Sequence, residues 1–397
     1  MTGQNIIYID DINIREKSLL VRVDMNVPMD ELGNITNDLR IRSVLPTVNY
    51  TLDEGCRVIL MSHMGRPKGN VNPDLRLDKV AEQLSNLLNH KVEKLHYCIG
   101  PSVEEKVNKM QPQDILMLEN IRFHEEEENC DEEFSKSLAN YGDLYVNDAF
   151  GVAHRAHASS YGVAKYLPSY AGFLIEKEVE ALSKILESPK KPLTLIFGGA
   201  KIDTKIAVIK NFLGIADNIL IGGGLANTFL HAQGFNVGES LYEPDKAEIA
   251  QEILLEAEKQ NTKILLPEDV VVADEIDENG DITDIPVRDV IGNMKILDIG
   301  EKSIKKYLEI VNNSEMVVWN GPLGYFELAP FEKASKLVAQ NLADFQMDSI
   351  LGGGETLQIL KKFMIPRESF SHVSTGGGAM LEFLTGKQLP ALKVLQK

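Results

Sequence analysis

Basic and polar side chains follow several apolar runs in the first half of the sequence. Arginine is prominent among them, and its flat, permanently charged guanidinium can grip a carboxylate or a phosphate at two points. The residues at these positions are Asp24, Asn26, His63, Arg66, Arg122, His154, Arg155 and His157, with Arg40 at the start of a helical segment. If the apolar runs are parallel strands, their carboxyl ends lie where such sheets bind ligands. The pattern favours a pocket for a small, multiply charged anion over separate surface arginines, although any one arginine alone would more often pair with a surface carboxylate.

The histidines of this set allow more than one chemistry. Imidazole can be a metal ligand or a general base, and His154 and His157 lie three residues apart. No nearby set of cysteines or carboxylates accompanies them in the sequence. We therefore expect them to form hydrogen bonds or to contact the anion.

The second half carries glycine at the corresponding positions. The segments are FGGAK (197–201), GGGLANT (222–228), NGPLG (320–324), GGGET (352–356) and STGGGA (374–379). Glycine between a strand and a helix lets phosphate oxygens approach backbone N–H groups and the positive end of the helix. Five such turns predict a phosphate-rich ligand, whereas one alone is as well explained by a tight chain reversal. Neither G-x-G-x-x-G nor G-x-x-x-x-G-K-[ST] occurs, so a dinucleotide fingerprint and a P-loop are not supported.

Two lysines follow the first glycine turn. Lys201 and Lys205 are four residues apart, so on a helix they share one face near its positive end. Mutually repelling cations at that place are costly unless an anion lies between them. Plain exposed helix lysines are the alternative, and the sequence leaves both interpretations open.

Composition excludes several classes of protein. The chain of 397 residues has 41 Lys plus Arg against 59 Asp plus Glu, a formal net charge of −18. A general affinity for nucleic acid or for an anionic membrane is not expected, so an anionic ligand must be held by local charges. No apolar run approaches the ~18 residues that a membrane-spanning helix needs. The first five residues lack a basic stretch followed by an apolar core, so no secretory signal is identified and a cytoplasmic location is expected.

Acidic residues and cysteines suggest no metal centre by themselves. The acidic run at residues 125–128, continued at 131–133, is consecutive rather than convergent, and we expect a solvated surface or a helix start. Cys56, Cys98 and Cys130 are odd in number and lack the CxxC spacing of a metal site. They are expected to be reduced thiols.

The elements that must position these residues alternate between strand and helix. Strands are expected at residues 18–27, 57–62, 115–120 and 144–150, and then at 193–199, 218–223, 263–274, 316–321, 349–354 and 372–376. Helices are expected at 77–88, 202–213 and 331–342, among others. Strand, helix, strand order in both halves predicts an α/β fold with two parallel, helix-covered sheets. The length also favours two domains, joined near residues 166–172, over one sheet of ten or more strands.

Nine short motifs are spread over nearly the whole chain. They are DMNVP, SHMGRP, LENIRF, DAFGVAHRAHAS, GGAKIDTK, GGGLANTF, WNGPLGYFE, GGGET and STGGGA. Their residues and their order resemble those of the phosphoglycerate kinase family. No single motif is decisive, but the combination is highly specific.

The resemblance implies two Rossmann-like domains whose parallel sheets face each other across a hinged cleft. It implies a phosphoglycerate-binding domain at residues 1–172, a nucleotide-binding domain at 173–380 and a C-terminal segment, 381–397, that packs back on the first domain. The implied reaction is reversible phosphoryl transfer from 1,3-bisphosphoglycerate to ADP, giving 3-phosphoglycerate and ATP, with Mg²⁺ as cofactor. A monomer with small-molecule substrates, and with no nucleic acid or membrane partner, is expected.

The resemblance also assigns roles to particular residues. Those that match the substrate-binding set are Asp24, Asn26, Arg40, His63, Arg66, Arg122 and Arg155. The expected nucleotide-binding residues are Gly199, Lys205, Gly223, Asn320, Glu327, Gly353, Gly354, Glu355 and Thr356, with Glu327 at the ribose. The expected catalytic residues are Arg40 and Lys201, which would contact the transferring group, and Gly353 and Gly376, whose helix starts would donate N–H groups. No general base is required, because the attacking oxygen is already ionised.

One residue departs from the family's pattern. Glu355 stands where the family usually has Asp in GGGDT, and it is the expected metal-linked residue. Its arm is one methylene longer, and Mg²⁺ demands near-ideal octahedral geometry. We expect either a shift of the backbone or a water between the carboxylate and Mg²⁺ to make room for the longer side chain.

Two other functions remain as alternatives. One is a different acyl-phosphate kinase, acting for example on carbamate or acetate, but the basic loops of the first half suit a larger substrate with both a phosphate and a carboxylate. The other is a phospholigand-binding scaffold that has lost catalysis, which Glu355 alone suggests.

Overall fold

A computed structural model describes residues 5–345 and 347–397, apart from the side chain of residue 204, so most of the N-terminal stretch inspected for a signal lies outside the described residues. The chain forms two compact units. One runs up to Ser183 and includes Lys387–Lys397, and the other is Lys184–Gly386. The division falls within helix α7 (Phe173–Glu187), later than the join expected at residues 166–172.

The first unit is built on a six-stranded parallel sheet with the order β3-β4-β2-β1-β5-β6. Its strands are β1 (Ser18–Val23), β2 (Arg57–Met61), β3 (Val92–Lys94), β4 (Ile115–Met117), β5 (Leu144–Asp148) and β6 (Ser169–Ala171). The four strands expected in this half are present, but each ends earlier than the apolar run suggests. Beyond the strands, side chains bond the backbone in place of the ladder, as where the Asn26 N–H donates to the Asp24 carboxylate.

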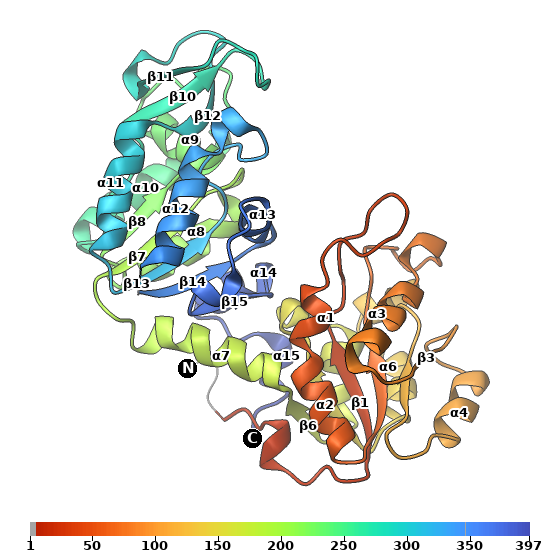
Figure 1. The fold of residues 1–397 in the computed structure, drawn as a ribbon. Helices are drawn as coiled ribbons and strands as arrows, with labels where there is room; N and C mark the ends of the chain where they lie inside the picture. The colour runs from red at the N-terminus through yellow and green to blue at the C-terminus, as the bar shows by residue number, and fades with distance from the viewer. Residues whose placement is uncertain (1–4, 346) are drawn as a thin grey trace. The chain divides into compact units, whose positions relative to one another are not determined.

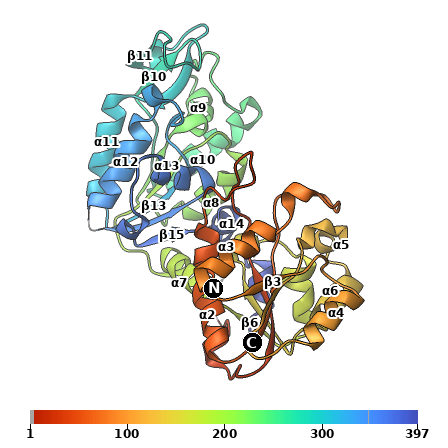
Figure 2. The same cartoon turned by 45° about the vertical axis from the view of Figure 1, so that its right-hand side comes forward.

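Helices cover this sheet. They are α1 (Leu39–Ser43), α2 (Leu45–Asp53), α3 (Asp78–Leu88), α4 (Pro101–Asn108), α5 (Glu125–Glu128) and α6 (Glu132–Ala139). Helix α1 leads directly into α2, with Val44 between them, and α3 lies beside α1 (Figures 1 and 2). The stripe expected on α3 faces the core, where Val80 and Leu84 pack in one cluster with Val21 and Leu60 of the strands.

The second unit contains another six-stranded parallel sheet, with the order β15-β14-β13-β7-β8-β9. Its strands are β7 (Leu193–Phe197), β8 (Asn218–Ile221), β9 (Lys263–Leu265), β13 (Met316–Asn320), β14 (Asp348–Gly352) and β15 (His372–Ser374). Its helices after α7 are α8 (Asp203–Phe212), α9 (Gly223–Ala232), α10 (Ala247–Lys259), α11 (Glu301–Asn312), α12 (Lys333–Asp344), α13 (Gly354–Lys362) and α14 (Gly378–Leu384). Trp319 of β13 is fully buried in a core with Tyr307 of α11 and Val338 of α12. The α/β class with parallel sheets is thereby confirmed.

The single strand expected at residues 263–274 is wrong. The chain leaves the parallel sheet after β9, and β10 (Asp269–Ala273) pairs in antiparallel fashion with β11 (Thr283–Pro286) and β12 (Lys295–Ile299). Pro267 lies between β9 and β10, and proline donates no N–H to a ladder. This three-stranded sheet was not anticipated from the sequence.

The C-terminal residues divide between the units. Helix α14 packs against α8, and the Asn211 amide donates to the Leu384 carbonyl at 2.8 Å. Helix α15 (Pro390–Lys393) belongs to the first unit, where the Ala391 N–H donates to the Ala153 carbonyl at 3.1 Å. The segment expected to return to the first domain therefore starts later in the structure, at Lys387.

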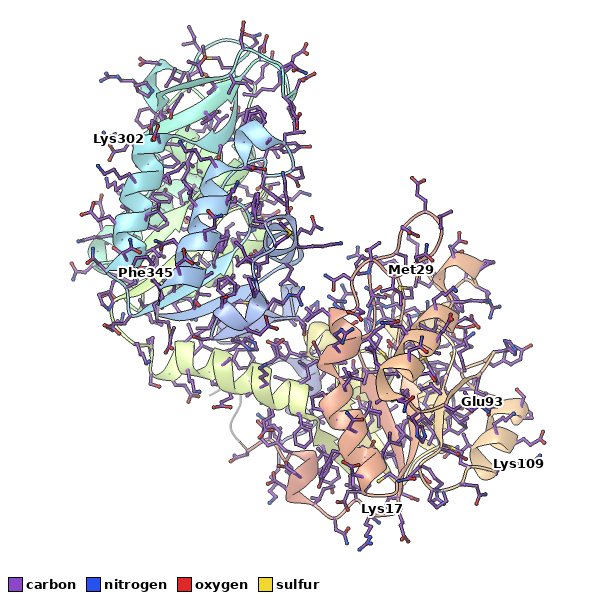
Figure 3. All side chains as sticks on the ribbon, in the orientation of Figure 1. Lys17, Met29, Glu93, Lys109, Lys302 and Phe345 are labelled. Atoms are coloured by element: carbon purple, nitrogen blue, oxygen red, sulfur yellow. The ribbon has the colours of Figure 1, made fainter. Side chains whose placement is uncertain are left out.

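The surface is rich in charge. Lys302, labelled in Figure 3, projects from α11 and contacts the Glu268 carboxylate, which Lys306 also contacts at 2.6 Å. Within the described residues, none of the helices is long and apolar enough to pass through a membrane.

Candidate active site

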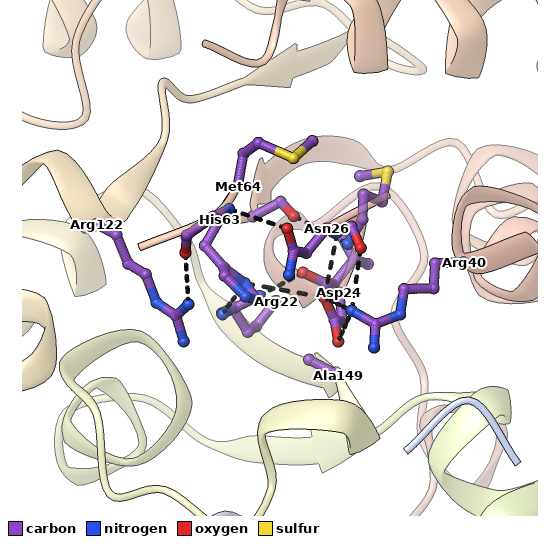
Figure 4. A network of polar contacts seen from close by, with 12 residues as sticks. Arg22, Asp24, Asn26, Arg40, His63, Met64, Arg122 and Ala149 are labelled. Carbon is purple, nitrogen blue, oxygen red and sulfur yellow. Dashed lines mark hydrogen bonds and ion pairs between the residues drawn. The ribbon is translucent and has the colours of Figure 1, made fainter. Parts of the chain in front are cut away.

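Asp24 organises the polar residues that follow β1. Its buried carboxylate accepts a hydrogen bond from Arg40 Nη1 at 3.2 Å, and the same Nη1 donates to the Asn26 carbonyl at 3.1 Å. The Asn26 side-chain oxygen accepts from the Gly65 N–H at 2.9 Å, which links the loop after β1 to the loop after β2. Figure 4 shows this network. The structure thus brings Asp24, Asn26 and Arg40 together as the sequence predicts.

Arg22 is a member of this site that sequence reasoning missed. It lies within β1 and is fully buried, so it carried no strand-end signal. Its Nε donates to Ser159 Oγ at 2.8 Å, its Nη1 donates to the Val23 carbonyl, and its Nη2 lies 3.2 Å from His63 Nδ1. A hydrophilic residue in the run LLVRV is the only hint in the sequence.

Arg122 and Arg155 extend the cluster. Arg122 is almost fully buried, donates from Nη1 to the Gly65 carbonyl at 2.8 Å, and has its Nε 3.5 Å from Glu128 Oε1. Arg155 is half-buried, and its Nε donates to His154 Nε2 at 3.2 Å. Arg66 is exposed, directly after Gly65. The described contacts therefore join Asp24, Asn26, Arg40 and Arg122 in one network through Gly65, while Arg155 contacts His154.

The cations of the cluster are close enough to alter one another's pKa values. Burial, and then the neighbouring Arg22, lowers the pKa of Arg122 to about 10. Burial, and then Arg155, lowers the pKa of His154 to about 4. The pKa of His63 lies well below its usual value because of burial and then Arg22, Arg122 and Arg40. Burial is the largest cause of each shift, and the neighbouring arginines add to it, so an anionic ligand would offset the part that these positive charges contribute.

Several buried polar atoms here lack a hydrogen-bond partner among the described residues. They are Arg122 Nε, His154 Nδ1 and His157 Nδ1. A buried donor or acceptor without a hydrogen bond is costly, so a ligand or an ordered water is expected to form hydrogen bonds with these atoms. With the surplus of cations, this makes the cluster a candidate site for a small anion.

The acidic run differs from the expected solvated surface. It does form a helix start, α5, but Glu127 is fully buried. Its carboxylate accepts hydrogen bonds from the Ser159 N–H at 2.9 Å and the Ser159 hydroxyl at 2.7 Å. The expectation of a solvated face is wrong for Glu127, because tertiary contacts supply donors that the run itself does not reveal.

In the second unit, the glycine turns interlock through their backbones. The Gly199 N–H donates to the Pro322 carbonyl at 2.7 Å, and the Gly223 N–H donates to the Leu323 carbonyl at 2.8 Å. A Cβ on Gly198 would lie 1.9 Å from the Pro322 carbonyl oxygen. Glycine is required there because one turn lies directly on another, which is a structural use of these residues that the ligand argument did not include.

A pocket of about 540 Å³ opens beside these turns. Gly199, Gly223, Glu327 and Glu355 line it, all of them predicted nucleotide contacts. Much of the remaining lining is apolar and includes Leu241, Tyr242, Ile296, Leu297, Leu323 and Tyr325. Apolar walls beside glycine turns suit a flat base with attached phosphates.

Lys205 and Glu355 lie close together at the edge of this pocket. A Cβ on Gly199 would meet Glu355 Oε2 at 3.3 Å and Lys205 Nζ at 3.4 Å. Burial lowers the pKa of Lys205, while the charges of Glu355 and Glu243 oppose this shift. Lys201, by contrast, is exposed, so the two lysines that the sequence treats as a pair differ in environment.

The remaining predicted residues either form hydrogen bonds to the backbone of the turns or lie at helix starts. Asn320 Nδ2 donates to the Gly352 carbonyl at 2.7 Å, and Thr356 Oγ1 accepts from the Gly321 N–H at 2.9 Å. Both side chains are buried. Gly353 precedes α13 with φ +104, and Gly354 begins that helix and is exposed. The Gly376 N–H donates to Ser374 Oγ at 3.0 Å, so in this state it is already engaged.

The acidic residues fit a metal brought by a nucleotide better than a metal held by protein alone. Within the described ranges, no group of three or more His, Cys, Asp or Glu side chains forms a metal cage. Mg²⁺ is usually bound through one or two carboxylates together with substrate phosphates. Glu355, exposed beside the glycine turns, matches that donor requirement.

Comparisons with known proteins identify relatives of this chain. The family model described as phosphoglycerate kinase matches residues 9–387. Phosphoglycerate kinase of Moorella thermoacetica is 48% identical over 97% of this chain and 98% of its own length, and that of Dictyoglomus turgidum is 47% identical over the whole of both chains.

Solved structures agree as well. The phosphoglycerate kinase of Coxiella burnetii superposes with a TM-score of 0.87 at 40% identity, covering 98% of both chains. That of Pyrococcus horikoshii has a TM-score of 0.86 at 35% identity, again covering 98% of both chains. Fold, motifs and relatives all agree, and the chain belongs to the phosphoglycerate kinase family, whose kinases transfer phosphate to a carboxyl acceptor.

Proposed function

We propose that the cation cluster of the first unit binds 3-phosphoglycerate or 1,3-bisphosphoglycerate, and that the glycine-lined pocket of the second unit binds ADP or ATP. The phosphoryl group passes directly between them. The observation that carries the proposal is the cluster itself, in which Arg22, Arg40 and Arg122 lie around His63, and Arg155 lies near Arg122, with few compensating acids. A substrate with both a phosphate and a carboxylate matches this surplus.

The substrate end depends on bidentate cations. Arg40 has Nη1 engaged by Asp24 and Asn26, which orients its guanidinium while leaving its other nitrogens for a ligand. Arg122 Nε and His154 Nδ1 are buried donors or acceptors that a bound anion would satisfy. Arg66, exposed beside Gly65, is proposed to close on the ligand from solvent.

The nucleotide end depends on backbone and on Lys205. Apolar residues such as Leu241 and Leu323 provide the walls for the base, and Glu327 at the pocket edge is proposed to bond the ribose. Lys205 and the helix starts at Gly199–Lys205 and Gly353–Thr356 provide positive charge for the phosphates. Glu355 would hold Mg²⁺ with the nucleotide, and that ion would offset negative charge on the phosphates.

The transfer step needs no general base and no covalent enzyme intermediate. The attacking oxygen, of a carboxylate or of a phosphate, is ionised near neutral pH. The protein therefore acts by positioning the reactants in line and by stabilising charge on the migrating group. Arg40 and Lys201 are proposed to contact that group, with backbone N–H groups near Gly353 and Gly376 as further donors. For Gly376 this requires release of its bond to Ser374.

The two ligand sites belong to different units of the chain. We therefore propose that catalysis requires the units to approach each other when both substrates are bound, as a hinge would allow. Small-angle scattering with 3-phosphoglycerate and a non-hydrolysable ATP analogue together should then give a smaller radius of gyration than either ligand alone. Equal radii under all conditions would contradict closure.

The function is tested by a coupled assay with 3-phosphoglycerate, MgATP and a nicotinamide-linked second enzyme. We expect turnover with the unaltered chain, and a fall of about a hundredfold or more in kcat for Arg40→Ala and for Lys201→Ala, with KM for ATP nearly unchanged. Lys109→Ala, an exposed lysine paired with Glu105, is the matched control. Full activity in both variants would remove them from the transition-state role, and activity with carbamate or acetate alone would assign a different kinase.

A further inference from the structure

A buried chain of polar contacts runs from Glu127 to the proposed substrate site. We propose that Glu127 is a positioning residue, which acts through Ser159 and Arg22 to hold His63 as the neutral tautomer with its proton on Nε2. The proposal rests on the assignment of the cation cluster to phosphoglycerate. It adds a residue that the strand-end motifs did not identify, and it assigns a protonation state to one that they did.

Glu127 is built into the fold as a buried anion. Its side chain is fully inaccessible, and both carboxylate oxygens accept from Ser159, one from the backbone N–H and one from the hydroxyl. His157 Nδ1 lies 3.6 Å from Oε1, beyond hydrogen-bond range. Burial by itself would raise the pKa of Glu127, but contact with His157, the Arg22 charge and the Ser159 bonds outweigh it and lower the pKa. The carboxylate is therefore ionised at neutral pH.

Ser159 links Glu127 to Arg22, because Glu127 fixes the direction of the Ser159 hydroxyl proton. A hydroxyl has a single proton, and here it is donated to Glu127 Oε1 at 2.7 Å. The Ser159 oxygen is thereby left as an acceptor, and Arg22 Nε donates to it at 2.8 Å. Without the carboxylate, the hydroxyl proton can rotate toward Arg22, where it would repel the Nε–H group of that arginine. Glu127 thus also offsets the positive charge of the fully buried Arg22, although Ser159 lies between the two side chains.

Arg22 in turn determines the tautomer of His63. A guanidinium has only donors, and its Nη2 lies 3.2 Å from His63 Nδ1 (Figure 4). Nδ1 must therefore accept, which leaves the ring proton on Nε2. Asp24 Oδ1 is 3.9 Å from the same Nδ1, too far for a hydrogen bond, and the two form an ion pair only when the ring is protonated.

The charged groups around His63 keep it neutral. Arg22, Arg40, Arg122 and His157 face it, and they outnumber the one neighbouring carboxylate, Asp24. Burial first, and then the charges of Arg22, Arg122 and Arg40, lowers its pKa well below the usual value. His63 would therefore offer one N–H donor, at Nε2, that does not change across the neutral pH range. A phosphate or carboxylate is the ligand that such a donor suits.

The first test reads the tautomer directly. Nitrogen-15 NMR of the whole unliganded chain, with the His63 signals assigned by comparison with His63→Gln, should show the Nε2–H form, unchanged between about pH 6 and pH 8. In Glu127→Gln and in Ser159→Ala the signals should move toward a mixture of tautomers. An imidazolium or an Nδ1–H form in the unaltered chain would overturn the proposal.

The second test reads ligand binding. Glu127→Gln keeps the shape but removes the charge and presents an amide to the Ser159 N–H. We expect KM for 3-phosphoglycerate to rise about tenfold to a hundredfold, with KM for ATP nearly unchanged. Ser159→Ala should shift the same constant in the same direction, and the exposed Glu125→Gln on the same helix should not.

The outcomes separate this inference from the proposed function. An unchanged KM for 3-phosphoglycerate in a folded Glu127→Gln protein, as judged by circular dichroism, would refute the positioning role. If that variant does not fold, Ser159→Ala and the tautomer of the unaltered chain decide the question. If the unaltered chain does not use 3-phosphoglycerate at all, the proposed function fails, while the NMR experiment still accepts or rejects the Glu127–His63 relay.

Discussion

At the scale of single residues, both proposed sites hold buried or half-buried charges in place with nearby opposite charges. In the first unit Arg22 and Glu127, both fully buried, share Ser159 as a common hydrogen-bond partner. In the second unit Lys205 is almost buried and lies next to Glu355. Removing Glu127 would leave the buried Arg22 without its nearby opposite charge, and removing Glu355 would do the same to Lys205, so each substitution acts on binding as well as on local structure.

Lys205 allows a test of the nucleotide site. Lys205→Met keeps the apolar stem but leaves Glu355 and Glu243 without a shared cation. We expect KM for ATP to rise about tenfold or more, while KM for 3-phosphoglycerate stays nearly constant. Steady-state kinetics with each substrate varied in turn measures both. Lys210→Met, an exposed position on the same helix α8, is the control, and an equal effect of both substitutions would argue against a direct phosphate contact.

Glu355 allows a test of the proposed metal link. Glu355→Asp shortens the arm by one methylene and restores the acid usual in the family. If the carboxylate approaches Mg²⁺ directly, the magnesium concentration for half-maximal activity should fall, by about two- to tenfold. If the carboxylate acts through a water, this magnesium concentration should fall by less than twofold or should rise. A magnesium titration at saturating ATP distinguishes these results, and no difference from the unaltered chain would mean that this residue does not influence the metal.

At the scale of elements, the glycine turns of the second unit depend on one another. The turns after β7, β8 and β13 bond through backbone groups, as where the Leu225 N–H donates to the Gly199 carbonyl at 3.0 Å. A turn that contacts another turn through its backbone has no room for a side chain. The glycine that allows phosphate to approach at one turn is therefore matched by glycine that allows a second turn to approach.

Gly198 and Gly354 provide a matched pair at this scale. Ala at Gly198 would place its Cβ 1.9 Å from the Pro322 carbonyl oxygen, whereas at Gly354 no atom lies within 4 Å. We expect Gly198→Ala to lower the free energy of unfolding by about 1–3 kcal/mol, and Gly354→Ala to leave it unchanged or slightly raise it. Urea unfolding followed by Trp319 fluorescence measures both. Similar stability of the two variants would mean that the turns shift apart at little cost.

At the scale of the whole molecule, stability has to be considered for each unit by itself. Trp319, the sole tryptophan of the chain, is buried in the core of the second unit, so its fluorescence reports on that unit. The same unit contains Asp298, which is 2% exposed and accepts from the Ala334 N–H at 3.0 Å and the Ile299 N–H at 2.9 Å. Burial raises the pKa of Asp298 to about 8 despite these bonds.

This shift predicts how the stability of the second unit depends on pH. Folded Asp298 retains its proton up to about pH 8, whereas the unfolded chain releases it near pH 4. Its stabilising contribution, complete below about pH 4, is therefore lost as pH rises between these values, at up to about 1.4 kcal/mol per pH unit. Asp298→Asn cannot titrate. The unfolding free energy of the unaltered chain minus that of the variant should fall between about pH 5.5 and pH 7.5.

The measurement is urea unfolding followed by Trp319 fluorescence at both pH values. Using a difference between two proteins cancels the titration of the other groups of the same unit. A difference that stays constant with pH would show that Asp298 is ionised in the folded state.

The sequence by itself predicted most strands of the two parallel sheets, the helical stripes and the positions proposed to hold phosphate. These features are local: a run such as LTLIF is apolar throughout because both faces of a parallel strand are buried, and glycine follows it where the chain must turn tightly. The end of the parallel strand β9 also has a local cause, which is Pro267. The pairing of the next strand, β10, depends instead on β12, which lies more than twenty residues further along the chain. Sequence pattern alone therefore missed the antiparallel sheet.

Tertiary structure alone decided which charged residues are buried and what they contact. Arg22 reaches Ser159 across 137 residues, and Glu127 reaches it across 32. Burial of a charge is tolerated only when donors or opposite charges converge on it in space, and neither residue type nor spacing along the chain records that convergence. For this reason Glu127 looked like one of four equivalent acids in the sequence, while the folded chain surrounds it with partners and leaves Glu125 exposed.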